Sequence, residues 1–130
     1  FFGVRPEDGR PIGELVLSGA KTASGDILWR REAAHDPITQ TGCLSIFHDG
    51  FGEPMGIIET TQVEIIPFNE VDAGFAEAGG EWGRTLENWR KAYWSWIEAE
   101  CKGIGRDPVP EIPMICERFR LIYSEPLGDI

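Results

Sequence analysis

The stretch Ser18-Gly19-Ala20-Lys21-Thr22-Ala23-Ser24-Gly25 places a lysine and a serine three residues apart, between two glycines. Lysine, unlike arginine, can lose its proton when it is buried and can then serve as a base. A neighbouring base can make a serine hydroxyl nucleophilic. The simpler interpretation of the same stretch is a turn that holds a solvated lysine and has no catalytic role. Residues three apart on a regular strand face opposite sides, so cooperation of Lys21 and Ser24 requires a turn, a helix end or a bulge.

Length and charge narrow the class of protein. A chain of 130 residues is expected to form one domain, over residues 1–130, with a true core. Its formal net charge is −10, whereas a protein that coats nucleic acid is normally basic. Contact with RNA would therefore need a local basic patch or recognition of a single nucleotide. The charge favours a small neutral or cationic substrate, and a negatively charged membrane is an equally poor partner.

The cysteines and histidines give no sign of a metal centre or a disulfide framework. The three cysteines form no CxxC pair, which predicts reduced thiols in a cytoplasmic protein. The spacing of Cys43, His35 and His48 fits no structural zinc pattern. No apolar run reaches the length of a membrane span, and no signal peptide is visible. We therefore expect no metal, no cofactor and no membrane partner.

Hydrophobic patterning predicts an α+β domain. The alternation of apolar residues predicts three strands, and helical spacing with capping residues such as Thr85 predicts three helices. The alternation slips at Leu121-Ile122, where we expect a β-bulge or burial on both faces. Mixed elements without a βαβ rhythm indicate a small antiparallel sheet or barrel. The expected strands cover residues 43–48, 55–66 and 114–123, the helices residues 12–18, 69–76 and 86–100, and the longest surface loop residues 30–42.

Three acidic residues outside the first stretch are candidates for chemistry. Glu81 lies in the loop Gly79-Gly80-Glu81-Trp82-Gly83, where it could act as a general acid or base or be a solvated loop residue. Glu59 lies in the middle of a predicted strand, so it either faces water or lines a pocket. Glu117, in the last predicted strand, poses the same question.

Read in order, several short motifs resemble a known family, the ASCH domain of the PUA-like superfold. The resemblance covers about residues 12–123, and it is the ordered set of motifs that is specific. The motifs are Gly19-x-Lys21-Thr22-Ala23-Ser24, Leu28-Trp29, Asp49-Gly50, Ile57-Ile58-Glu59-Thr60-Thr61, Pro67-Phe68-x-Glu70-Val71, Gly80-Glu81, Leu86-x-x-Trp89-Arg90 and Cys116-Glu117-Arg118-Phe119.

The resemblance implies a fold, a site and a substrate class. The fold would be a small β-barrel with flanking helices and a cleft over the barrel mouth. Some small bacterial members resemble amidohydrolases that remove the acetyl group from N4-acetylcytidine, and one branch is reported to cleave RNA. The catalytic lysine, hydroxyl and glutamate of the deacylating members correspond to Lys21, Ser24 and Glu81. Further substrate contacts are expected from Thr22, Trp29, Glu59, Trp82 and Arg90.

This sequence departs from the family pattern in three places. Ser24 stands where threonine is usual, Gly79-Gly80-Glu81-Trp82-Gly83 has lost two of three acids, and Cys43 replaces a common aspartate. The leading hypothesis is hydrolysis of an acylated nucleoside: Ser24 attacks, Lys21 takes its proton or stabilises the developing charge, and Glu81 handles the proton of the leaving amine. The alternatives are a module that binds RNA or a modified nucleotide without catalysis, and a ribonuclease. The partner would be a nucleoside or single-stranded RNA.

Overall fold

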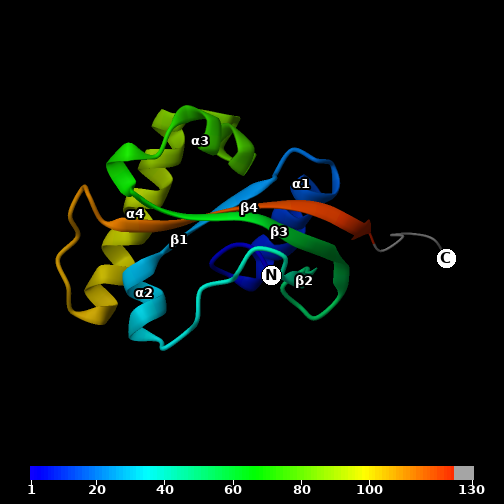
Figure 1. The fold of residues 1–130 in the computed structure, drawn as a ribbon, viewed down its shortest axis with the longest axis horizontal. Coiled ribbons are helices and arrows are strands. Elements are labelled where there is room, and N and C mark those ends of the chain that lie inside the picture. The colour runs from blue at the N-terminus through cyan, green and yellow to red at the C-terminus, as the bar shows by residue number, and fades with distance from the viewer. Residues whose placement is uncertain (125–130) are drawn as a thin grey trace.

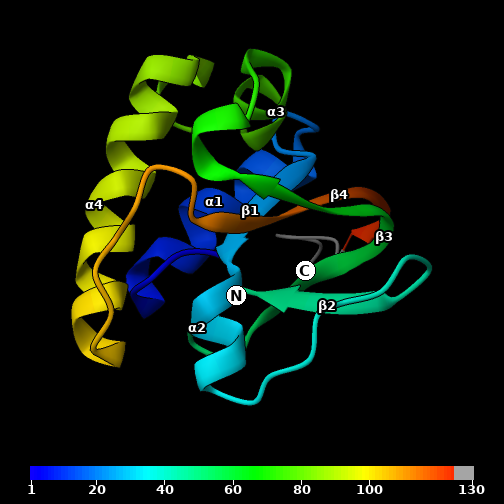
Figure 2. The ribbon, with the colours of Figure 1, turned by 60° about the vertical axis from the view of Figure 1, so that its left-hand side comes forward.

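The computed structural model describes residues 1–124, so the end of the predicted domain, residues 125–130, lies outside the described residues. A four-stranded antiparallel sheet runs through the molecule in the order β1-β4-β3-β2. The sheet curls into a half-barrel, and helices lie around it (Figures 1 and 2). The predicted α+β class is confirmed. The strands are β1 (Ala23–Ile27), β2 (Leu44–His48), β3 (Pro54–Pro67) and β4 (Pro113–Ser124).

The helices are short, apart from one. They are α1 (Gly9–Leu17), α2 (Leu28–Ala33), α3 (Ala73–Gly79) and α4 (Leu86–Ile104), with 3-10 turns at Pro6–Asp8, Phe68–Glu70 and Trp82–Arg84. Thr85 caps α4 as predicted, since its side-chain oxygen accepts a hydrogen bond from the Asn88 N–H at 3.2 Å. The prediction of a helix over residues 69–76 is wrong about where the helix, α3, begins. It begins after Asp72, whose carboxylate accepts from the Phe75 N–H at 2.8 Å.

The long strands β3 and β4 pair along most of their length. Their register shifts where Ile57 faces Tyr123 but Ile58 faces Leu121, so Ile122 is the extra residue of a bulge. The irregularity predicted at Leu121-Ile122 is thus present. A second register shift lies between Thr60 and Gln62. Bulges bend a strand and increase its twist, and here they accompany the curl of the sheet.

Two buried clusters hold the helices to the sheet. The larger one joins α3 and α4 to β1 and β4, with Trp89, Tyr93 and Ile97 of α4 at its centre. The smaller one joins Val16 of α1 to β2, β3 and β4. Gly13 makes the second contact possible, because a Cβ there would lie 2.5 Å from the Met55 sulfur. The helices are therefore held to the sheet through two separate clusters.

The sequence predicts a turn within residues 18–25 and a surface loop over residues 30–42, and the structure differs from both. Residues 23–27 form the edge strand β1, and residues 28–33 form α2. The Asp26 carboxylate accepts hydrogen bonds from Arg30, at 3.0 and 2.9 Å, and from Arg31. These contacts fix a helix too short to be recognised by its periodicity.

Candidate functional site

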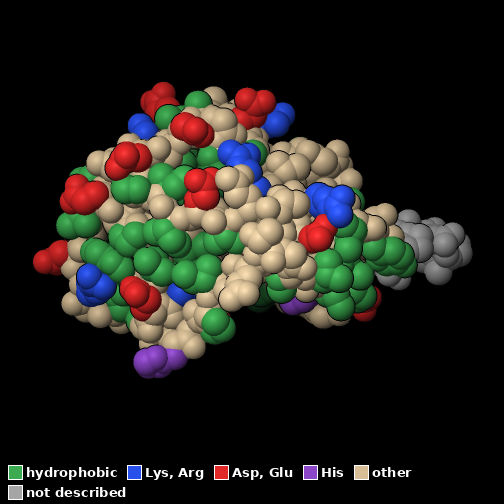
Figure 3. Space-filling view, viewed as in Figure 1, with side chains coloured by type: hydrophobic (Ala, Val, Ile, Leu, Met, Phe, Trp, Pro, Cys, Tyr) green, Lys and Arg blue, Asp and Glu red, His purple; other side chains and the backbone are tan. Residues whose placement is uncertain are grey.

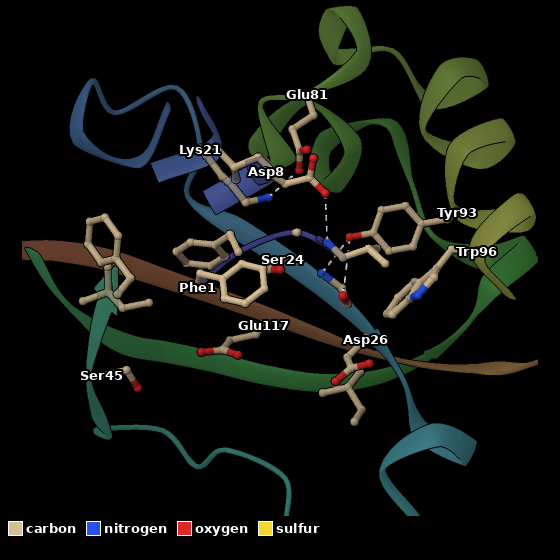
Figure 4. Close-up of a pocket in the computed structure, with 18 of the residues that line it drawn as sticks. Phe1, Asp8, Lys21, Ser24, Asp26, Ser45, Glu81, Tyr93, Trp96 and Glu117 are labelled. Carbon is tan, nitrogen blue, oxygen red and sulfur yellow. Dashed lines mark hydrogen bonds and ion pairs between the residues drawn. The ribbon is translucent and has the colours of Figure 1, made fainter. Parts of the chain in front are cut away.

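A cleft of about 680 Å³ lies on the concave face of the sheet. All four strands contribute side chains to its wall, and the N-terminal segment, the 81–82 loop and α4 close its sides (Figure 4). Aromatic rings line much of it, including Phe2, Trp82, Tyr93 and Trp96. The cleft therefore combines an apolar wall with a few polar groups, as ligand sites usually do.

Lys21 reaches this cleft from the segment between α1 and β1. Its backbone N–H still bonds the Leu15 carbonyl at 3.0 Å, which holds it against the end of α1. The backbone of Gly80 packs so closely that a Cβ there would lie 2.5 Å from the Ala20 carbonyl oxygen. Gly80 also has φ +75°, so a glycine is needed on both grounds. This close packing brings the 79–81 loop to the lysine.

The Lys21 ammonium is buried and paired. Its side chain is 2% exposed, and its Nζ lies 3.0 Å from Glu81 Oε2 and 3.1 Å from the Gly79 carbonyl oxygen. Burial lowers the pKa of Lys21, while the charge and the hydrogen bond of Glu81 oppose that effect. A lysine whose pKa is lowered and whose partner is a carboxylate is suited to proton transfer. The predicted proximity of Lys21 and Glu81 is present in the structure.

Ser24 lines the same cleft from β1. It lies next to Gly25, whose N–H donates to Tyr93 Oη at 3.1 Å. A Cβ on Gly25 would lie 2.9 Å from the Tyr93 ring, so this glycine lets the strand approach α4. Within residues 1–124, no hydrogen bond joins the Ser24 hydroxyl to Lys21 or Glu81. The three side chains share one cleft, with only Lys21 and Glu81 in direct contact.

Of the expected substrate contacts, only Trp82 lines the cleft. This residue is 40% exposed. Thr22 is exposed, and its backbone bonds Ala78 and Phe119. Trp29 packs under the guanidinium of Arg106, 3.5 Å from the ring centre. Glu59 bonds Arg120 at 2.6 Å. These three side chains do not line the cleft.

Arg90 does not line the cleft either. It donates to the carbonyls of Asn69 and Val71 at 3.3 and 3.2 Å, and so ties α4 to the segment before α3. Its role in this structure is that of a tether between two elements. The prediction that it contacts substrate finds no support in its position.

Several cleft residues were not predicted, because only the fold brings them together. Tyr93 and Trp96 lie on one face of α4 and stand in edge-to-face contact, with ring centres 5.9 Å apart. The Asp26–Arg30–Arg31 cluster lies at one end of the cleft. Glu117 lies on β4 directly opposite Ser24. Glu117 was a sequence candidate, with the direction of its side chain left open.

No group of three or more His, Cys, Asp or Glu side chains in the described part of the chain is arranged to hold a metal ion. No helix within residues 1–124 is long and apolar enough to cross a membrane.

The curled sheet, its helices and the cleft define a small PUA-like domain, and comparisons with known proteins place it in a family. The model of the ASCH domain matches residues 1–123, so the chain belongs to the ASCH domain family. A crystal structure of an ASCH domain from Lactobacillus crispatus JV V101 is similar, with TM-score 0.90 and 26% identity, covering 95% of this chain and 78% of that one. A crystal structure of a protein from Enterococcus faecalis V583 is similar with TM-score 0.85 and 31% identity, covering 95% and 74%. The comparison with curated proteins gives no match.

Proposed function

We propose that this protein is an amidohydrolase that removes the acyl group from an acylated nucleoside such as N4-acetylcytidine. The observation that carries the proposal is the buried Lys21 ammonium, bonded to Glu81 at 3.0 Å in a cleft that Ser24 also lines. ASCH domains are thought to bind RNA or to act on substrates related to nucleic acids, which makes a nucleoside the substrate class to test first.

The chemistry would proceed in two steps. Ser24 Oγ attacks the acyl carbonyl carbon, and its proton passes to the Lys21–Glu81 pair. The C–N bond then breaks, the pair returns the proton to the leaving amine, and the acyl group remains as an ester on Ser24. Water hydrolyses that ester, releases the carboxylic acid and regenerates the hydroxyl. An ammonium has three donors, of which Gly79 and Glu81 use two, so the third is available to a developing oxyanion.

The walls of the cleft favour a nucleoside. Trp82, Tyr93 and Trp96 offer aromatic surface, and stacking on a base contributes about 1–3 kcal/mol. This supports the proposal without depending on base-specific hydrogen bonds.

The charges of the cleft argue against an RNA strand. Four carboxylates line it, Asp8, Asp26, Glu81 and Glu117, against the cations Lys21, Arg30 and Arg31. Asp26 already binds both arginines, and Glu81 binds the lysine. Figure 3 shows Lys and Arg side chains scattered among acidic ones on the face in view, with no basic patch. Since phosphate contacts dominate the affinity for nucleic acids, an uncharged nucleoside suits the cleft better.

Incubation with N4-acetylcytidine, followed by chromatography for cytidine, tests the proposal. We expect turnover by the wild type and loss of at least about 100-fold in Lys21→Met and Ser24→Ala, the range for removing a catalytic acid–base group. Lys91→Met is the matched control, because Lys91 is exposed on α4 and its ion pair is with Glu87 on the same helix. A short single-stranded RNA is tested in parallel. An inert protein that binds this RNA intact would be a binding module, and one that cuts it would be a ribonuclease; either result overturns the proposal.

The pH dependence identifies the form of Lys21 that acts. Since burial lowers the pKa of Lys21, its neutral form is populated at pH values below its ordinary pKa of 10.5. If Lys21 accepts the proton of Ser24, kcat/KM rises as pH rises through that lowered pKa. A fall in kcat/KM over the same range would instead assign Lys21 an electrostatic role as the ammonium.

A further inference from the structure

Glu117 faces Ser24 across the β1–β4 pair. The two residues are directly opposed in the register, and both line the cleft. Directly opposed residues of an antiparallel pair have Cβ atoms about 4.5–5.5 Å apart. The Glu117 side chain therefore starts close to Ser24 and extends into the same cleft. Figure 4 shows the Glu117 carboxylate on the floor of the cleft, below Ser24 and between Ser45 and Asp26.

Glu117 differs from the other acids of the cleft in its partners. Glu81 pairs with Lys21, Asp26 with Arg30 and Arg31, and Asp8 with Arg5. Within the described residues, Glu117 forms no ion pair. Its one hydrogen bond comes from the Thr60 hydroxyl, which donates to Oε1 at 2.7 Å.

Thr60 fixes the carboxylate in place. It is 1% exposed, so its hydroxyl has little freedom to take another partner. A carboxylate accepts about four hydrogen bonds, and Thr60 supplies one of them. The remaining acceptor capacity, on a half-buried group in an aromatic cleft, calls for a donor, because an unsatisfied buried acceptor is costly.

We propose that Glu117 binds the N–H of the scissile amide and thereby makes the cleft selective for secondary amides. This rests on the proposed function. In an N-acyl substrate the amide nitrogen is one bond from the carbonyl carbon that Ser24 attacks, so a residue opposite Ser24 reaches that N–H. The carboxylate accepts the hydrogen bond and holds the carbonyl carbon toward Ser24. A tertiary amide offers no such donor.

The test is a cycle of two enzymes and two substrates. Wild type and Glu117→Gln are each assayed with N4-acetylcytidine and with its N4-methyl derivative, which lacks the N–H. We expect the variant to lose roughly 10- to 100-fold in kcat/KM on the secondary amide, as for loss of a charged hydrogen bond, with little change on the tertiary amide. Glu117→Asp, which keeps the charge, should recover part of the preference. Glu64→Gln removes the same charge from the same sheet, outside the cleft, and should not alter the preference.

The outcomes separate the two proposals. Equal losses of Glu117→Gln on both substrates would show a merely structural role and overturn the inference, while the proposed function stands. If the wild type turns over neither substrate, the proposed function fails and the inference falls with it. Thermal melting of each variant reports whether it is folded. Should Glu117→Gln not fold, the preference of Glu117→Asp decides: an unchanged preference, with the carboxylate withdrawn by one methylene, would also overturn the inference.

Discussion

Replacing Glu81 by glutamine should destabilise the protein by an amount that shrinks as the pH rises. The substitution keeps an oxygen that can accept a hydrogen bond from Lys21 and removes the negative charge. The Lys21 side chain is 2% exposed, so its ammonium would be left buried without a counter-charge. Breaking a buried ion pair by removing one partner costs about 3–5 kcal/mol.

The cost has an upper limit set by the lysine itself. Without Glu81, the effect of burial on the pKa of Lys21 is unopposed, and Lys21 can escape the penalty by losing its proton. At pH 7, neutralising a lysine with an ordinary pKa of 10.5 costs about 5 kcal/mol. At pH 9 the same cost is only about 2 kcal/mol.

The sign of this pH dependence follows from the number of protons that the folded and unfolded states bind. The folded variant holds Lys21 with a lowered pKa, whereas the unfolded chain binds that proton up to pH 10.5. Unfolding therefore takes up a proton, and stability rises with pH between the two values. In the wild type this rise is weaker, because Glu81 opposes the effect of burial.

Urea unfolding of the wild type and Glu81→Gln at pH 7 and pH 9 measures the loss of unfolding free energy and its change with pH. We expect a difference in unfolding free energy of about 3–5 kcal/mol at pH 7, and of no more than about 2 kcal/mol at pH 9. Glu64→Gln, an exposed charge on β3, is the control and should differ from the wild type by less than about 0.5 kcal/mol. A difference below 1 kcal/mol at pH 7, or one equal at the two pH values, would refute the burial of a charged Lys21.

Two further predictions concern the walls of the cleft. Trp82→Ala should raise the KM for the nucleoside about 5- to 100-fold and leave the melting temperature nearly unchanged, because this side chain is 40% exposed and is available to stack on a base; an unchanged KM would remove Trp82 from the site. Gly25→Ala should lower the unfolding free energy by about 1–3 kcal/mol, because the new Cβ meets the Tyr93 ring at 2.9 Å; calorimetry that shows no loss would mean that α4 moves freely away from β1.

The elements with strong local patterns could be predicted from the sequence. Alternating apolar residues located β2, β3 and β4 to within two residues, and the Thr85 cap located the start of α4. By contrast, β1 consists of Ala23-Ser24-Gly25-Asp26-Ile27, which has almost no apolar alternation. It is a strand because β4 pairs with it, and that is a tertiary effect that local propensity cannot reveal.

The site, like the fold, could be predicted from the sequence only in part. The contact of Lys21 with Glu81 was expected from the resemblance to the ASCH family, since 60 residues separate the two in the chain. Glu59 was expected in the cleft, yet its neighbour Thr60 is the residue that points inward, and neighbours on a strand face opposite sides. Which of the two side chains points inward depends on the register and on the bulge after Thr60. No motif encodes that choice.

The strand pairing also explains how so acidic a protein could hold the proposed nucleoside site. The net charge of −10 is spread over the molecule, whereas three of the four cleft carboxylates are held by cations of the same chain. Among the described residues, Glu117 is the cleft carboxylate that forms no ion pair, and it lies opposite the proposed nucleophile. A phosphate bound there would face that unpaired carboxylate, while an amide N–H would satisfy it. The local charge pattern, more than the overall charge, thus favours a neutral acylated base over an RNA strand.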